Sequence, residues 1–238
     1  MQPALNRNKK TEIEFSQIKP YLLKIPTVTH WGTLDASQKS KNSQEANALS
    51  ISLHPEDWSA ITPLGPSLFL LEKKNAKFLD KYTFSDSPYM ELVWNWASEN
   101  GYVKKGTLYK IIYDNEGEEV EQIFDNLDEA ENEIDGLSEE VQEVSGYLMT
   151  PKMLKRSLHS EEVGAEHVFA EDFAISFFME DNFPQLDGIW WEDTYDPLEL
   201  SCPRGGIFPG KVKSWNSKKI TLEEFWELGL EEEGLVFS

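Results

Sequence analysis

Three short segments of the chain carry side chains suited to ligand binding or catalysis. The first, HWGT at residues 30–33, joins a histidine and a tryptophan to a glycine that lets backbone approach a ligand. The second, LSISL at residues 49–53, puts two hydroxyl groups on one face of an expected strand. The third, DGIWWED at residues 187–193, places carboxylates after two tryptophans. A fixed carboxylate beside flat rings can stabilise a cation that develops in a reaction.

Each segment also has a purely structural explanation. His30 can cap a turn, and the two serines of the second segment can form the solvent face of an edge strand. The two tryptophans of the third segment can belong to the core, with Glu192 and Asp193 in the turn that follows. For each segment taken alone, the structural explanation is favoured.

Other kinds of site find little support in the sequence. The four histidines lack the spacing of a zinc site, and the acidic region lacks a calcium-loop pattern. Neither a Rossmann nor a P-loop glycine motif is present, and no G-x-S-x-G nucleophile motif occurs. Cys202 is the single cysteine and has no histidine near it in sequence, so neither an internal disulfide nor a catalytic cysteine is predicted.

Short strands and a few helices are expected to position these segments. Apolar alternation and turn residues predict strands at 27–33, 48–55, 67–73, 145–151 and 186–193, and a hairpin at 106–124. Start and stop signals predict helices at 87–100 and 221–230, a more ambiguous helix at 171–182, and a helix or broken helix pair at 127–144. Residues 235–237 fit a strand or a docking tail equally well. Because no regular βαβ alternation occurs, we predict a single α+β domain over residues 1–238.

The charge of the chain is strongly negative and uneven. With 22 Lys and Arg against 43 Asp and Glu, the formal net charge is −21. This balance argues against direct binding to nucleic acid backbone or to anionic membranes. Between Ile111 and Pro151 there are fourteen acids and no Lys or Arg. We therefore expect an acidic hairpin and helix insertion at 111–145, either as a solvated face or as a docking surface for a basic protein.

The ends of the chain and its hydropathy predict where the protein acts. No run approaches the roughly 18–20 apolar residues that a membrane helix needs. The first residues lack the apolar segment of a signal peptide. A cytoplasmic protein that does not contact membranes is the expectation.

Taken together and in order, the three segments resemble the ADP-ribosyltransferase superfamily. A His-x-Gly-Thr motif ends an early strand, a Ser-x-Ser strand follows about twenty residues later, and a late strand ends in an acid. The resemblance is to the branch of diphtheria toxin and the poly-ADP-ribose polymerases. It covers short blocks at about 30–58 and 186–208, and the second block is similar to bacterial and phage-encoded members. It implies a split, twisted β-sheet with flanking helices.

The resemblance implies NAD as the ligand and a role for each matched residue. In that family the matching histidine holds the adenosine ribose, which assigns this role to His30. The backbone of Gly32 and Thr33 would meet the nicotinamide amide. Ser50 and Ser52 would line the wall of the pocket.

The resemblance also implies a catalytic acid and an aromatic platform. Glu192 is our choice for the acid, with Asp193 second and Asp187 third. The family usually stacks nicotinamide on a tyrosine. The candidates for this platform are Tyr82, Tyr89 and, with less support, Trp31 and Trp58.

The sequence is compatible with three functions. The first is an NAD-dependent ADP-ribosyltransferase that modifies a protein or nucleic acid, or an NAD glycohydrolase if water accepts the ADP-ribose; a toxin or effector is compatible with it. The second is a non-catalytic acidic binding protein or inhibitor, a nucleic-acid mimic whose residues 114–143 dock a basic partner. The third is a glycosidase that uses two of Asp187, Glu192, Asp193 and Asp196. Carboxylates this close in sequence rarely flank a sugar at the separation that glycosidases need.

Overall fold

The computed structural model describes residues 13–35, 46–55, 67–115, 118–134, 141–158, 169–191, 204–229 and 236–237. These residues form the mixed α+β fold that the sequence predicts, with three sheets and helices packed between them. Within the described residues, no helix is both long and apolar enough to cross a membrane.

The largest described sheet has six strands in the order β12-β1-β5-β9-β10-β3. Strands β5 and β9 are parallel, and every other neighbouring pair is antiparallel. The last strand, β12, forms at the C-terminal segment for which the sequence left a strand and a docking tail open. The bounds are β1 (Leu22–Lys24), β3 (Leu49–Ile51), β5 (Lys77–Asp80), β9 (Gly188–Trp190), β10 (Gly205–Ile207) and β12 (Val236–Phe237).

A second, three-stranded sheet adjoins the end of the first. Its order is β11-β4-β2, and all its pairs are antiparallel. The bridge between Thr29 and Ser52 links β2 to the chain just after β3, so the two sheets meet there. The bounds are β2 (Thr27–Trp31), β4 (Leu68–Glu72) and β11 (Asn216–Ile220), followed by α7 (Leu222–Glu227). Thr221 and Glu224 form the capping box that starts α7, as the sequence predicts.

The third sheet, β7-β6-β8, contains the predicted hairpin. Its strands are β6 (Val103–Asn115), β7 (Glu118–Phe124) and β8 (Gln142–Met149), and α4 (Leu127–Glu133) lies between β7 and β8. The prediction of helix up to residue 144 is wrong at its end, because residues 142–149 pair with 103–110 along the whole of β8. Pairing with a long partner strand overrides the acidic, helix-like local pattern there.

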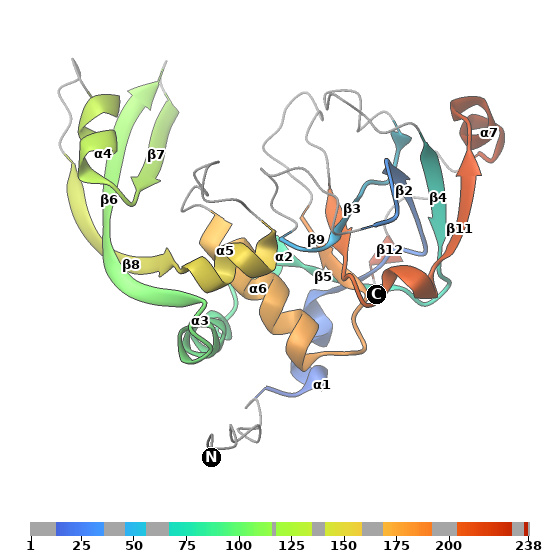
Figure 1. Cartoon of the computed structure of the whole chain (residues 1–238), viewed down its shortest axis with the longest axis horizontal. Helices are drawn as coiled ribbons and strands as arrows, with labels where there is room; N and C mark the ends of the chain where they lie inside the picture. Colours follow the sequence, from blue (N-terminus) through green and yellow to red (C-terminus); the bar gives the residue numbers. More distant parts are fainter. Residues whose placement is uncertain are drawn as a thin grey trace.

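Helices lie between these sheets. Figure 1 shows β7-β6-β8 and α4 on one side of the molecule and β11-β4-β2 with α7 on the opposite side, with α5 and α6 between them. The segment 171–182 is helical, and most of its side chains are buried. The bounds are α1 (Phe15–Ile18), the 3-10 helix η1 (Lys19–Tyr21), α2 (Lys81–Ser85), α3 (Met90–Glu99), α5 (Pro151–Ser157) and α6 (Phe169–Asn182), and a further 3-10 turn spans Val212–Ser214.

Arg156 of α5 forms hydrogen bonds that connect this helix to α6. Its guanidinium donates hydrogen bonds to Glu180 and Asp181 at 2.7–2.9 Å and to the Tyr102 hydroxyl at 2.8 Å. The same guanidinium lies 4.2 Å from the centroid of the Phe177 ring. Burial by itself would lower the pKa of Arg156, but the hydrogen bonds to Asp181, Glu180 and Tyr102 hold it above its usual range. The C-terminal half of α6 is thereby fixed against the neighbouring helix.

Candidate active site

His30 lies on β2 with its ring buried between two backbone carbonyls. Its Nδ1 is 2.7 Å from the carbonyl oxygen of Ser50, and its Nε2 is 2.8 Å from that of Thr33. Burial lowers the pKa of His30, and the two carbonyls oppose that shift because they favour the doubly protonated ring. A neutral imidazole carries one N–H, so it can donate to only one of the two carbonyls. The ring therefore holds the 30–33 turn against the chain at Ser50.

The two serines that the sequence groups together have different surroundings. Ser50 is half-buried on β3, whereas Ser52 is fully buried. The backbone of Ser52 exchanges two hydrogen bonds with Thr29, at 2.7 and 3.0 Å. The explanation of both serines as the solvent face of an edge strand is therefore wrong for Ser52. The structure brings His30 and both serines together, because β2 runs alongside the end of β3.

The glycine after His30 is needed by the turn that the histidine holds. Gly32 has φ +140°, a conformation that side chains disfavour, and a Cβ there would lie 3.2 Å from His30 Nε2. Its N–H donates to the carbonyl of Ser67 at 2.8 Å. Thr33 is exposed, and its hydroxyl accepts a hydrogen bond from the N–H of Asp35. The predicted close approach of backbone at 30–33 thus has a local structural cause as well.

A ladder of backbone hydrogen bonds joins this turn region to the end of β9. The N–H of Trp191 donates to the carbonyl of Arg204 at 2.8 Å, and the N–H of Arg204 donates to the carbonyl of Ile51 at 3.0 Å. Strands β3, β5 and β9 end on one side of the six-stranded sheet, and β10 begins there. We call this side of the sheet the β9 edge. Glu192 and Asp193 directly follow Trp191 in the sequence. They lie outside the described residues, as do Trp58, Asp196 and Cys202.

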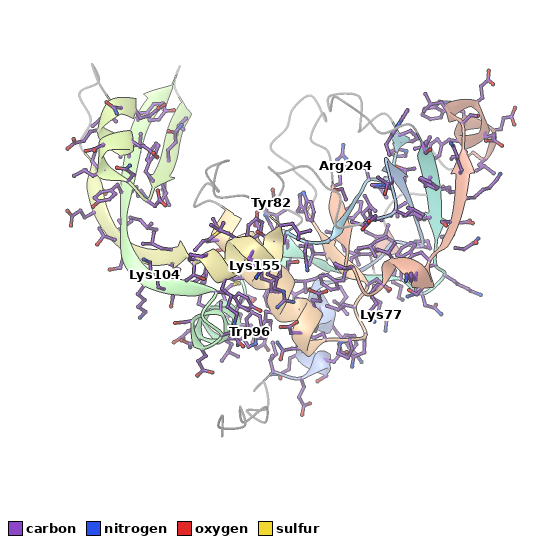
Figure 2. All side chains as sticks on the ribbon, viewed as in Figure 1. Lys77, Tyr82, Trp96, Lys104, Lys155 and Arg204 are labelled. Atoms are coloured by element: carbon purple, nitrogen blue, oxygen red, sulfur yellow. The ribbon has the colours of Figure 1, made fainter. Side chains whose placement is uncertain are left out.

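The two tyrosine candidates lie in different places. Tyr82 is on α2, directly after β5, whose last residue Asp80 pairs with Trp190 of β9. Figure 2 shows Tyr82 and Arg204 on the same side of the sheet, with Lys77, at the other end of β5, on the opposite side. Tyr89 packs edge-on against Tyr21 with ring centroids 6.4 Å apart, next to α1 and η1. Tyr82 is thus the candidate that belongs to the β9 edge.

Two other candidates have structural partners. The carboxylate of Asp187 is buried and binds Lys73 Nζ at 2.6 Å and the N–H of Lys77 at 3.0 Å. It ties the turn between β4 and β5 to the start of β9, at the end of the strand away from the β9 edge. Trp31 is half-buried and packs on the small cluster formed by β4, β11 and α7.

A buried ion pair that sequence reasoning missed also adjoins the β9 edge. Lys81 follows the last residue of β5, and its Nζ lies 2.8 Å from Asp172 Oδ1 of α6, with both side chains under 10% exposed. Burial raises the pKa of Asp172, and the charge of Lys81 and its hydrogen bond oppose that shift. Burial also raises the pKa of the adjacent Glu171, with the charge of Asp172 as the next cause. One sequence signal was present, an aspartate within an apolar helix segment, whereas the strand before Lys81 was not predicted.

Comparison of the chain with models of protein families, with curated proteins and with solved structures finds no match in any of the three. In the described residues, no group of three or more His, Cys, Asp and Glu side chains is arranged to hold a metal ion. The residues at the β9 edge therefore carry the only information about its chemistry. They are a buried histidine, the half-buried Ser50, a buried arginine, a tyrosine, and a strand end that is followed in the sequence by two carboxylates.

Proposed function

We propose that the protein is an NAD-dependent ADP-ribosyltransferase, or an NAD glycohydrolase when water is the acceptor, whose site lies at the β9 edge. The observation that carries the proposal is the backbone ladder from Trp191 through Arg204 to Ile51, continued by the bond from His30 to Ser50. Segments that lie far apart in the sequence are adjacent through this ladder. They are the same segments whose order resembles the ADP-ribosyltransferases.

Four described residues at the β9 edge have a role in the proposed reaction. Arg204 is the cation suited to the NAD diphosphate, because a guanidinium binds phosphate oxygens through paired hydrogen bonds. His30 offers Nε2 to a ribose hydroxyl, which would take the place of the Thr33 carbonyl that Nε2 faces in this structure. Lys81 Nζ lies over the Tyr82 ring, 4.6 Å from its centroid, so nicotinamide would have to stack on the opposite face of that ring. The half-buried Ser50 forms part of the wall.

The reaction breaks the bond between nicotinamide and the ribose C1′ and forms a bond from C1′ to the acceptor. Nicotinamide leaves with the bonding electron pair as a neutral ring, and the ribose passes through an oxocarbenium-like state. The carboxylate of Glu192 would stabilise this positive charge and take up the proton that the acceptor loses. Asp193 is the alternative carboxylate for the same task.

The test is nicotinamide release from NAD by the purified protein, with and without a cell lysate, in parallel with Glu192→Gln. We expect release to fall by on the order of 10²–10³ in the variant, the usual effect of removing one electrostatic stabiliser. Asp196→Asn, which removes a carboxylate from the same segment, is the matched control and should retain activity. Release that requires lysate would indicate a macromolecular acceptor. Absence of both NAD binding and nicotinamide release would refute the proposal.

A second candidate function, docking of a basic protein by residues 114–143, is favoured by the exposure of the acids in that segment. Seven of its acidic side chains are described, and all seven are exposed: Glu121, Asp125, Asp128, Glu129, Glu131, Glu133 and Glu143. The two candidates are compatible, since a transferase needs a surface that selects its target. Binding of a basic protein should weaken steeply with salt, because exposed charges are screened over about 8–10 Å at physiological ionic strength.

A further inference from the structure

A large cavity lies between the β7-β6-β8 sheet and the start of α6, where its lining residue Glu171 is next to Asp172 of the buried ion pair. Its volume is about 840 Å³, and it is lined from β6, β7, β8, α3, α4 and α6. Such a volume falls within the range of about 300–1,000 Å³ that is typical of ligand pockets. None of the described residues that line it belongs to the candidate NAD site. The cavity is therefore a candidate binding site separate from the proposed NAD site.

Aromatic rings form one part of the cavity lining. Trp94 of α3 and Tyr147 of β8 stack face to face, with ring centroids 4.5 Å apart and planes 6° from parallel. Both rings line the cavity, together with Phe124 of β7. Because the two stacked rings cover each other's inner faces, only the outer faces of the stack can receive a cation. Such electron-rich faces attract cations, and a planar guanidinium is the protein cation that stacks on them best.

Carboxylates from three elements form the other part of the lining. Glu121 comes from β7, Glu129 from α4 and Glu171 from α6, and Asp125 lies just after β7. Among the described lining residues there is no Lys, Arg or His. Within the described part of the chain, Lys110 is the one cation that forms an ion pair with any of the four, through Glu121.

The electrostatics of the cavity select the sign of its ligand. Burial raises the pKa of Glu171, and the negative charges of Asp172 and Asp86 add to that effect while Lys81 opposes it. The four acidic side chains of the lining would repel a further anion, so the diphosphate of NAD does not suit this cavity. A cation with flat, hydrogen-bonding geometry suits both the rings and the carboxylates.

We infer that this cavity binds an arginine side chain of a partner protein, with the guanidinium against an outer face of the Trp94–Tyr147 stack and its N–H groups directed to the surrounding carboxylates. The inference rests on the second candidate function, the docking of a basic protein, and narrows it to one side chain in one cavity. It is independent of the transferase reaction. It also extends the docking site beyond residues 114–143, to α3 and α6.

The test uses three capped tripeptides, Ac-Gly-Arg-Gly-NH₂ and its citrulline and lysine counterparts, titrated by calorimetry into the full chain. Citrulline keeps the shape of arginine but is neutral. We expect the arginine peptide to bind, and the citrulline peptide to bind at least about tenfold more weakly, because charge-assisted hydrogen bonds are lost. The lysine peptide should also bind more weakly, since an ammonium group cannot stack on the rings as a guanidinium does. Equal binding of the three peptides, or no binding of the arginine peptide, would overturn the inference.

Matched variants locate the binding. Glu129 and Glu131 are both exposed on α4, but only Glu129 lines the cavity. Glu129→Gln should weaken the arginine peptide by up to about fivefold, the scale of a partly exposed ion pair, and Glu131→Gln should leave it unchanged. Trp94→Leu should abolish the preference for arginine over lysine, which depends on ring stacking, whereas Trp226→Leu on the distant α7 should preserve it. Equal effects of Glu129→Gln and Glu131→Gln would place the binding on the outer surface of α4, which would refute the cavity site while leaving the docking function standing.

Discussion

The β9–β10 part of the six-stranded sheet differs from the β7-β6-β8 sheet in how far its side chains are buried. Every residue of β9 and β10 is buried, so both faces of those strands are covered. Along β8, by contrast, every residue is exposed or half-buried. The first region holds polar groups in fixed positions, and the second presents charge on its surface. The proposed reaction lies in the first region, and the proposed docking of a basic partner lies in the second.

The difference follows from what surrounds each sheet. Trp190, Phe78 and Trp215 pack ring against ring around β9 and β5, and helix α6 contacts β9. An unpaired polar group in such a region costs about 1–3 kcal/mol. Among the described residues, the buried indole N–H groups of Trp190 and Trp215 are unpaired, whereas His30, Asp187 and Asp172 all have polar partners. The β7-β6-β8 sheet carries few such constraints, so acids can accumulate there.

The largest expected effect is at the glycines of the two regions. A Cβ on Gly188 of β9 would overlap the carbonyl oxygen of Gly206 in the neighbouring strand, and backbone cannot move aside cheaply. A Cβ on Gly106 of β6 would meet the end of the Leu148 side chain, which can rotate. We expect Gly188→Ala to cost more than about 4 kcal/mol in the free energy of unfolding, and Gly106→Ala about 1 kcal/mol. Urea unfolding followed by circular dichroism measures both. If the two variants lost similar amounts of unfolding free energy, the proposed difference in packing between the two sheets would be wrong.

The second comparison is between the ion pairs of the two regions. Asp172→Asn leaves the charge of Lys81 buried without a counter-charge, and we expect a loss of about 3–5 kcal/mol. Glu121→Gln breaks the more exposed pair with Lys110 and should cost under about 1 kcal/mol. The double replacement Lys81→Met with Asp172→Leu should recover much of the loss, since apolar groups can fill the same space. The contrast would be wrong if Asp172→Asn were no more costly than Glu121→Gln in the same unfolding assay.

Local patterns in the sequence predicted the elements that depend on near neighbours. The strand predicted at 48–55 contains β3, and the helix predicted to begin at residue 221 is α7, which starts directly after Thr221. The hairpin of β6 and β7 was also predicted, because its arms and turn lie within one short stretch. These signals need no knowledge of the rest of the fold.

Contacts between distant segments were beyond the sequence. Lys81 and Asp172 are 91 positions apart, and no local pattern pairs them. Ser52 is on the polar phase of its strand, yet it is buried because β2 happens to cover it. Asp187 is a further example, because its carboxylate binds Lys73, which is 114 positions away in the sequence. The order of the three site segments could be seen in the sequence, but their adjacency depends on strand pairing.

The smallest expected effect is a pH dependence of stability carried by His30. Burial lowers its pKa in the folded protein below the ordinary value of 6.5, so the unfolded chain binds the proton more readily. The contribution of His30 to stability is therefore fully present above about pH 6.5 and is lost as the pH falls toward the folded pKa. Comparing the free energy of unfolding of the wild type with that of His30→Gln between about pH 5 and pH 8 isolates this term.

The difference between the two proteins should grow as the pH rises and should level off near the ordinary histidine pKa. The raised pKa values of Glu171 and Asp172 act in the opposite direction, because folded carboxyls with raised pKa values lose stability as the pH rises, but they are present in both proteins and cancel. A difference that shrinks with rising pH would mean that the two carbonyls of Ser50 and Thr33 outweigh burial and keep the ring charged. In that case His30 would be a fixed cation at the β9 edge, and its proposed task would change from holding a ribose hydroxyl to binding a phosphate.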